Sequence, residues 1–137
     1  MKKFIFTILL FFSTSFSFSQ SSTYYSTFVK KATWSEYQQK FIWNDGNKTN
    51  LKIVMLDNFI RIYDDAESYY VLKGDEKKSK KIEYEMSTWD ANDERGRRVK
   101  VSIIHYFDDD TVVLMVMYED IAFAYTVTSQ GLSPLNN

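Results

Sequence analysis

The segment VKVSIIHYFDDDTVVLMVMYEDIAFAYTV, residues 99–127, decides the fold class of this chain. Its first part alternates apolar and polar positions, a period of two that places one face of a strand against a core. Three aspartates then mark a turn, and the runs 112–118 and 121–127 that follow are apolar at nearly every position. Only Glu119-Asp120 separates these two runs, so we expect a tight hairpin of two central strands. Strands that are apolar on both faces need cover from a second sheet, a helix or a partner.

The chain upstream of this segment continues the pattern of short strands separated by turn residues. Strands are predicted at residues 51–56, 59–63, 69–72 and 82–86. The charged stretch Gly74–Lys80 and the stretch Asp90–Gly96 are predicted to be loops, because turn residues and charges dominate them. The sequence therefore predicts an all-β antiparallel meander of seven or eight strands, as a closed up-and-down barrel or a two-layer sandwich.

Residues 33–43 fit two structures. Thr33 and Glu36 have the spacing of a helix capping box, which favours one short N-terminal helix. The alternation of aromatic and polar residues from there to Trp43 fits a strand equally, with Asp45-Gly46 as the turn into the next run. Strand and helix both remain open for this stretch.

The first nineteen residues have the layout of a secretory signal peptide. Lys2-Lys3 precedes the apolar run Phe4–Phe12, and Ser17-Phe18-Ser19 places small residues at the cleavage site. The apolar run has about half of the ~20 residues that a membrane-spanning helix needs. We therefore predict a signal peptide at 1–19 and an exported protein, periplasmic or extracellular, with no membrane span after cleavage.

Composition sets the domain count and excludes several kinds of chemistry. Residues 20–130 are predicted to form a single β domain, followed by a flexible tail at 131–137. The chain has no cysteine, which excludes disulfides, thiolate zinc sites and thiol nucleophiles. It has 17 basic and 18 acidic residues, and Lys2-Lys3 leaves with the signal. The resulting mild acidic balance disfavours a nucleic-acid partner, which needs a concentrated basic surface.

Aromatic residues are the best functional lead, with 10 Tyr, 11 Phe and 3 Trp in the chain. Exposed Trp and Tyr side chains stack on sugar rings or anchor protein partners. The candidate ligand-binding residues are Trp34, Trp43, Trp89, Tyr70, Tyr106 and His105. The alternative is that these rings fill the core of a domain without disulfides. Because neighbours in a strand face opposite sides, Tyr69 and Tyr70 cannot both lie in that core.

No catalytic or metal-binding constellation emerges from the sequence. His105 is the only histidine, and its strand position suggests a structural role or a ligand contact rather than a catalytic base. Asp90, Asn92 and Glu94 resemble the start of a calcium-binding loop. The closing glutamate is missing, however, because Val101 stands in its place. We predict a solvated turn there, no metal and no cofactor.

These observations lead to two functional hypotheses. The first is an exported, non-catalytic binding or interaction domain for an unknown protein or small ligand. The alternative is a small exported hydrolase that uses carboxylates. It would need two acidic side chains in one cleft, at least one of them with a raised pKa. The sequence names neither the ligand nor the oligomeric state.

Overall fold

The computed structural model describes residues 22–127, which form nine antiparallel strands. The predicted signal peptide at 1–19 and the predicted tail at 131–137 lie outside these residues. The all-β prediction is confirmed, since the described part of the chain contains no helix. Accordingly, residues 22–127 include no helix long and apolar enough to cross a membrane.

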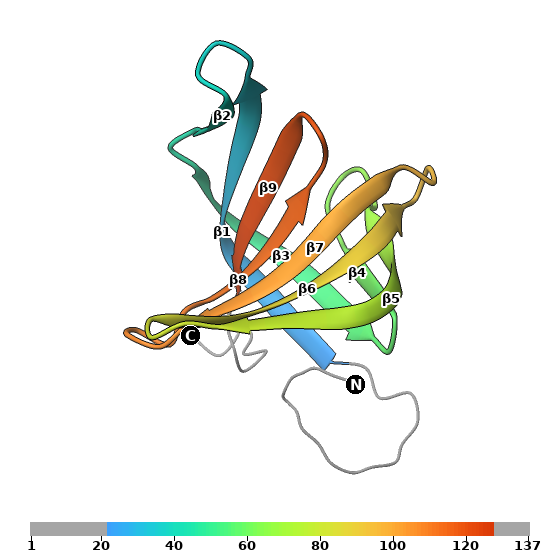
Figure 1. Ribbon diagram of the computed structural model, residues 1–137. Coiled ribbons are helices and arrows are strands. Elements are labelled where there is room, and N and C mark those ends of the chain that lie inside the picture. Colours follow the sequence, from blue (N-terminus) through green and yellow to red (C-terminus); the bar gives the residue numbers. More distant parts are fainter. Residues whose placement is uncertain (1–21, 128–137) are drawn as a thin grey trace.

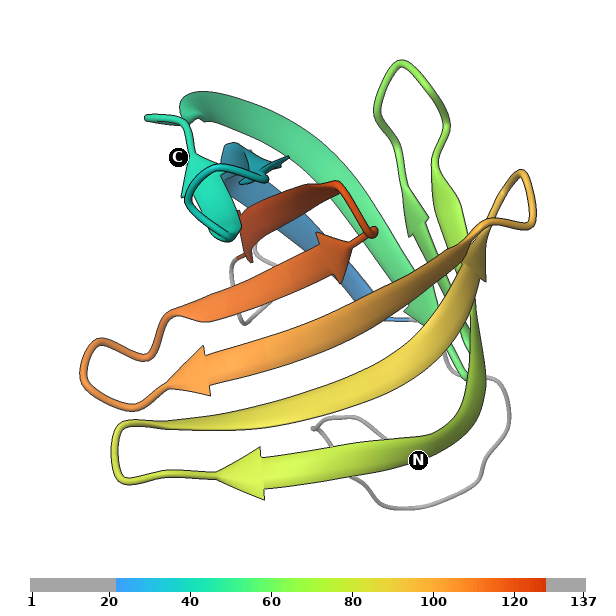
Figure 2. The same ribbon diagram turned by 45° about the horizontal axis from the view of Figure 1, so that its top comes forward.

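The nine strands belong to one sheet that closes in a ring (Figure 1). The strands are β1 (Ser22–Ser35), β2 (Lys40–Trp43), β3 (Asn47–Leu56), β4 (Phe59–Ile62), β5 (Tyr69–Lys80), β6 (Tyr84–Asp93), β7 (Arg98–Tyr106), β8 (Val112–Met117) and β9 (Ile121–Val127). Strands β3 to β9 follow one another as a meander, and Figure 2 shows β5 to β9 as curved neighbours. Strand β1 lies between β2 and β3 and also pairs with β9. The result is one closed sheet with nine strands instead of seven or eight, rather than the two separate sheets of a sandwich.

Strand β1 divides its length among three partners. Its start pairs with β3 from Ser22 to Val29, its middle pairs with β9 as far as Thr33, and its end pairs with β2 as far as Ser35. The register shifts between Ser26 and Phe28 against both β3 and β9. Such a bulge bends a strand and increases its twist. The bent β1 can therefore bond to β3 and β9 at once and close the ring.

The strands predicted within residues 99–127 are confirmed, and their inward-facing side chains lie in the core. Val101 lies opposite Val116, and Leu114 lies opposite Tyr125, so these side chains share the inner face. The buried core cluster consists of Ile53, Ile60, Ile62, Tyr70, Ala91, Val99, Val101, Leu114, Val116, Tyr125 and Val127. Inward-facing positions from seven strands thus fill the ring.

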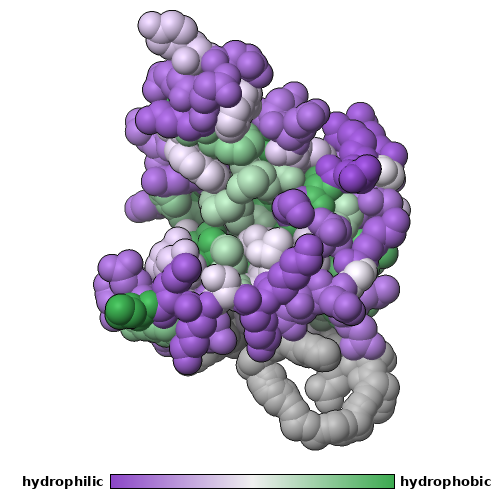
Figure 3. All heavy atoms as spheres, viewed as in Figure 1, coloured by the Kyte–Doolittle hydropathy of each residue, from purple (hydrophilic) through white to green (hydrophobic). Residues whose placement is uncertain are grey.

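The outer face of the two apolar strands differs from the expectation. Val113, Met115 and Ala124 are half-buried there, and Figure 3 shows apolar residues gathered in the middle of this face. All nine strands belong to one sheet and residues 22–127 contain no helix. Residues 22–127 therefore supply no second sheet or helix that covers this face, contrary to the expectation.

The strand interpretation of residues 33–43 is confirmed for 33–35 and 40–43, residues 36–39 form a turn instead, and the helix alternative is wrong. Thr33 pairs with Ile42 on one side and with Ile121 on the other, so the sheet takes up backbone that a helix would need. Ser35 instead closes a turn. The Gln38 N–H donates to its Oγ at 3.1 Å, and the Gln39 N–H donates to its carbonyl oxygen at 2.7 Å.

Two predicted loops are largely strand. Gly74–Lys80 belongs to β5 and pairs with β6, and Asp90–Gly96 shrinks to a turn because β6 continues to Asp93. Polar side chains pair across these strands. Lys77 lies opposite Thr88, and the Ser87 hydroxyl donates to the Glu76 carboxylate. Charge density misled the prediction, because residues 77–80 form the exposed edge of the sheet, paired with β6 on one side, and such an edge needs few apolar residues.

The break between β2 and β3 depends on Asn44 and Gly46. The Asn44 N–H donates to the Lys31 carbonyl oxygen at 2.9 Å, and the Asn44 Oδ1 accepts from the Lys31 N–H at 3.0 Å. Gly46 has a φ of 86°, in the left-handed region that glycine adopts most readily. A Cβ at Gly46 would lie 2.5 Å from the Phe28 ring. This break therefore requires glycine on both conformational and steric grounds.

We predict that Gly46→Ala lowers the free energy of unfolding by about 2–4 kcal/mol, the sum of a left-handed backbone cost and an overpacking cost. Gly74→Ala is the matched control. Gly74 has a φ of 71°, but a Cβ there would have no neighbour within 4 Å. It should lose only the backbone cost of about 1–2 kcal/mol. Urea unfolding of the two variants measures both, and equal losses would contradict the packing argument.

Candidate functional site

The six predicted ligand-binding residues lie at three separate places. Trp34 and Trp43 are on β1 and β2, Tyr70 and Trp89 are on β5 and β6, and His105 and Tyr106 are at the end of β7. None of the three tryptophans is fully buried. Figure 1 places the β1–β2 turn and the end of β7 at opposite ends of the sheet. The six residues therefore do not form one site.

Tyr70 and Trp89 face the interior. Tyr70 is 3% exposed and belongs to the core cluster, while Trp89 lies opposite the buried Val101. Tyr69 points the other way and stacks on Phe59 with ring centroids 5.2 Å apart, as predicted for neighbours in a strand. Burial raises the pKa of Tyr70 to about 12. Its hydroxyl therefore stays protonated and bonds to the polar network beside it.

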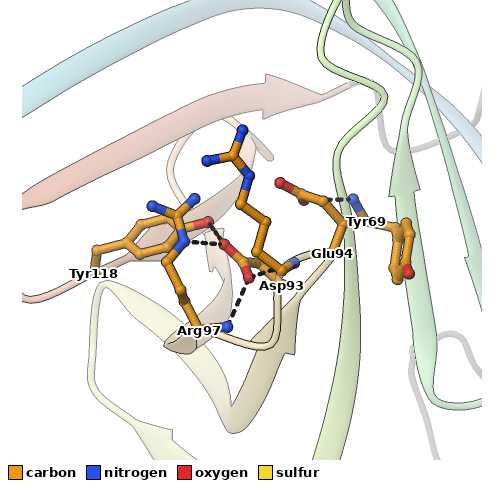
Figure 4. A network of polar contacts seen from close by, with 6 residues as sticks. Tyr69, Asp93, Glu94, Arg97 and Tyr118 are labelled. Atoms are coloured by element: carbon orange, nitrogen blue, oxygen red, sulfur yellow. Dashed lines mark hydrogen bonds and ion pairs between the residues drawn. The ribbon is translucent and has the colours of Figure 1, made fainter.

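That network is centred on the buried carboxylate of Asp93 (Figure 4). Its Oδ2 accepts from the Tyr118 hydroxyl at 2.7 Å and from Arg97 Nε at 2.8 Å. Its Oδ1 accepts from the backbone N–H groups of Arg95 and Arg97 at 2.9 and 2.8 Å. The Arg97 guanidinium also lies 5.0 Å from the centroid of the Tyr118 ring. The network ties the β6–β7 turn to the end of β8.

Proton positions in this network are fixed. Burial acts to raise the pKa of Asp93, but the hydrogen bonds from Tyr118, Arg97 and Arg95 outweigh it and hold the pKa below its usual range. Burial, followed by the hydrogen bond to Asp93, raises the pKa of Tyr118. Asp93 is therefore a carboxylate and Tyr118 a neutral donor at neutral pH. A pair with these states holds a structure together and offers neither a general acid nor a general base.

The end of β7 carries paired rather than convergent side chains. His105 Nε2 hydrogen-bonds to the carboxylate of Asp110, and its ring lies edge-on to Phe107. Tyr106 packs against Tyr84 with centroids 5.8 Å apart. Among residues 22–127, no three His, Cys, Asp or Glu side chains are grouped to hold a metal ion. This end of the sheet therefore presents separate contacts rather than one site.

The β1–β2 hairpin and the β8–β9 turn border an open surface hollow of ≈ 480 Å³, which we call the hairpin hollow. It is lined by Trp34, Glu36, Gln39, Phe41, Glu119 and Asp120. Trp34 and Phe41 form an edge-to-face pair with centroids 5.3 Å apart. The backbone N–H of Trp34 donates to the carbonyl oxygen of Asp120 at 2.9 Å, and this bond joins the hairpin to the β8–β9 turn. The volume lies within the roughly 300–1,000 Å³ typical of small-molecule sites.

Exposed apolar side chains surround this part of the molecule. Tyr37, in the turn of the hairpin, is 95% exposed, and Ile42 and Trp43 on β2 are exposed as well. The hairpin projects beyond the rest of the sheet (Figure 1). Ile42 and Trp43 follow one another on β2 and therefore face opposite sides of the hairpin.

Sequence reasoning found one wall of the hairpin hollow and missed the other. Trp34 was predicted, and the acidic pair Glu119-Asp120 was interpreted only as a turn. The two walls are joined by the pairing of β1 with β9, such as Thr33 with Ile121. Asp93 was missed as well, although an Asp three residues before Gly96 is a turn signal that could have identified it.

No family model, no curated protein and no solved structure matches this chain.

We predict that Asp93→Asn lowers the free energy of unfolding at pH 7 by about 1.5–3 kcal/mol, since it removes hydrogen bonds to a buried charge. The pKa of Asp93 is lowered by folding, so its contribution is present above the unfolded value of about 3.9 and is lost as the pH falls below it. The wild type should therefore lose this contribution in acid, whereas the variant should not. Chemical unfolding at a series of pH values measures the difference.

The control is Asp90→Asn on the same strand. Asp90 is exposed and accepts from Lys100 Nζ at 2.9 Å, and exposed ion pairs contribute little. This variant should unfold nearly like the wild type. If both variants lost the same stability, the buried network would not be the stabilising feature.

Proposed function

We propose that this protein is an exported, non-catalytic binding domain whose ligand docks in the hairpin hollow. One observation carries the proposal. The Trp34–Phe41 pair lines an open hollow of ≈ 480 Å³ next to exposed Tyr37. Aromatic side chains supply large contact area at a low cost in conformational entropy, which is why they dominate binding hot spots. The signal-peptide pattern at 1–19 supports export.

The position of these rings supports a binding role rather than a packing role. The core cluster is complete without them, because it draws on β3 to β9. A ring such as Tyr37, at 95% exposure, gains nothing from folding. Tyr37 lies in the turn next to Glu36, which lines the hollow, so its ring is available to a ligand that docks there.

The carboxylate hydrolase is the second candidate, because Glu36, Glu119 and Asp120 line the same hollow. Such an enzyme needs a general acid whose pKa is raised toward neutrality. Glu36, Glu119 and Asp120 are all exposed to solvent, whereas a general acid of this kind is held in a desolvated pocket. This exposure favours binding without turnover.

The test is a ligand screen observed through the three tryptophans. Each indole N–H of the mature protein gives its own signal in a ¹H–¹⁵N spectrum, and single Trp→Phe variants assign the three signals. We expect mixtures of soluble sugars, amino-acid amides and amines to contain compounds that shift the Trp34 signal while the Trp43 and Trp89 signals stay in place. Trp34→Ala should weaken such binding about tenfold, which corresponds to the roughly 1–2 kcal/mol of one aromatic contact.

Trp43→Ala is the matched control, because Trp43 is exposed on the same hairpin but does not line the hollow. It should keep the affinity of the wild type. The proposal is wrong if no compound moves the Trp34 signal, or if both variants lose binding equally. Chemical change of a bound compound over the hours of the measurement would favour the hydrolase instead.

A further inference from the structure

We infer that the ligand of the hairpin hollow presents a cationic group, a protonated amine. This inference rests on the proposed function and specifies the chemistry of the ligand. The hollow combines an aromatic pair with three carboxylates and has no basic residue in its lining. Each of these features favours a positive charge for a separate physical reason.

The three carboxylates lack neutralising partners in the described part of the chain. Glu36, Glu119 and Asp120 make no ion pair and no side-chain hydrogen bond with another of residues 22–127. Asp90 and Asp93, by contrast, are paired with Lys100 and Arg97. The hairpin hollow therefore gathers three acidic side chains that have no ion pair within residues 22–127. A cationic ligand would relieve the mutual repulsion, and an anionic one would increase it.

The aromatic pair adds an attraction of the same sign. The faces of aromatic rings are negative, and tryptophan binds cations most strongly of the aromatic side chains. Trp34 and Phe41 stand edge to face at an interplanar angle of 79°, so their faces point in different directions. An ammonium group at one of these rings also comes close to the acidic turn at Glu119-Asp120, because the rings and the turn line the same hollow. The backbone N–H of Trp34 donates to the carbonyl oxygen of Asp120 and holds the two sides together.

The size of the hollow favours an organic cation over a metal ion. A metal needs its ligands within about 2.0–2.6 Å of one point, and these carboxylates are not grouped in that way within residues 22–127. They are spread around ≈ 480 Å³, which accommodates an alkylammonium group with its carbon chain. The ammonium group would lie between the ring faces and the carboxylates, and the carbon chain would extend along the hollow.

The backbone that carries these groups is fixed before any ligand arrives. The Gln39 side-chain amide donates to the Glu36 carbonyl oxygen at 2.7 Å, and the Gln39 N–H closes the turn on Ser35 at 2.7 Å. A fixed frame lowers the entropy that binding would otherwise cost. The backbone of the hairpin hollow is therefore already in place before a ligand binds.

The experiment titrates the mature protein with Nα-acetyl-lysine methylamide and follows the Trp34 indole signal. The matched probe is the same compound acetylated at Nε, which keeps the carbon chain but loses the charge. We expect the charged probe to bind at least tenfold more tightly, and its affinity to fall severalfold between about 50 mM and about 300 mM NaCl as charges are screened. Spermidine is the second cationic probe. A preference for spermidine would identify free amines as the source of the cation, and a preference for lysine-containing peptides would identify a protein partner.

The variants separate charge from shape. Glu119→Gln combined with Asp120→Asn should weaken the charged probe about tenfold while it leaves the acetylated probe unchanged. Asp65→Asn removes one acidic charge from an exposed loop outside the hollow and should change neither. Equal affinity for the charged and acetylated probes would overturn the inference.

The two proposals fail in different ways. If a neutral sugar moves the Trp34 signal and no amine does, the binding function stands and the cationic ligand is refuted. If no probe in the screen moves it, both are refuted.

Discussion

Strand β1 hydrogen-bonds to three other strands, and both the closed sheet and the hairpin hollow depend on how its length is shared. If β1 paired with β3 alone, β9 would be left as an unpaired edge, although nearly every one of its residues is apolar. An edge of that kind is a site of aggregation. The bulge between Ser26 and Phe28 prevents this outcome, because the bend lets the middle of β1 reach β9. The same pairing then carries Trp34 to the carbonyl oxygen of Asp120.

How much of the fold the sequence predicts follows from the range of each interaction. Residues 99–127 were predicted well, since alternation and short turns are local signals. The pairing of β1 with β9 that closes the ring could not be predicted, because neither the segment around Ala32 nor the segment around Ala122 carries a sequence signal for its partner. The lysine-rich Gly74–Lys80 was misinterpreted for a different reason. This stretch is the exposed end of an edge strand, where charged residues are common, so its composition resembles that of a loop.

The residues of the candidate site were also predicted only in part. Trp34 and Trp43 were predicted from composition, and they lie at the projecting hairpin. Tyr70, predicted in the same way, belongs to the core cluster. Composition cannot distinguish an inward ring from an outward one when the neighbouring Tyr69 is equally suited to the other face. The acidic wall of the hollow was recognised only as a turn, because its meaning depends on closure.

The two acidic clusters of this sheet illustrate opposite uses of charge. Around Asp93, every oxygen of a buried carboxylate accepts hydrogen bonds, and the charge holds a turn to the end of β8. Glu119 and Asp120, in contrast, are exposed to solvent and make no ion pair with another of residues 22–127. Like charges that lie close together destabilise a folded protein slightly, and a ligand that neutralises them stabilises it on binding. The proposed cationic ligand would act in this way at Glu119 and Asp120, whereas the hydrogen-bonded Asp93 network needs no ligand to hold its turn.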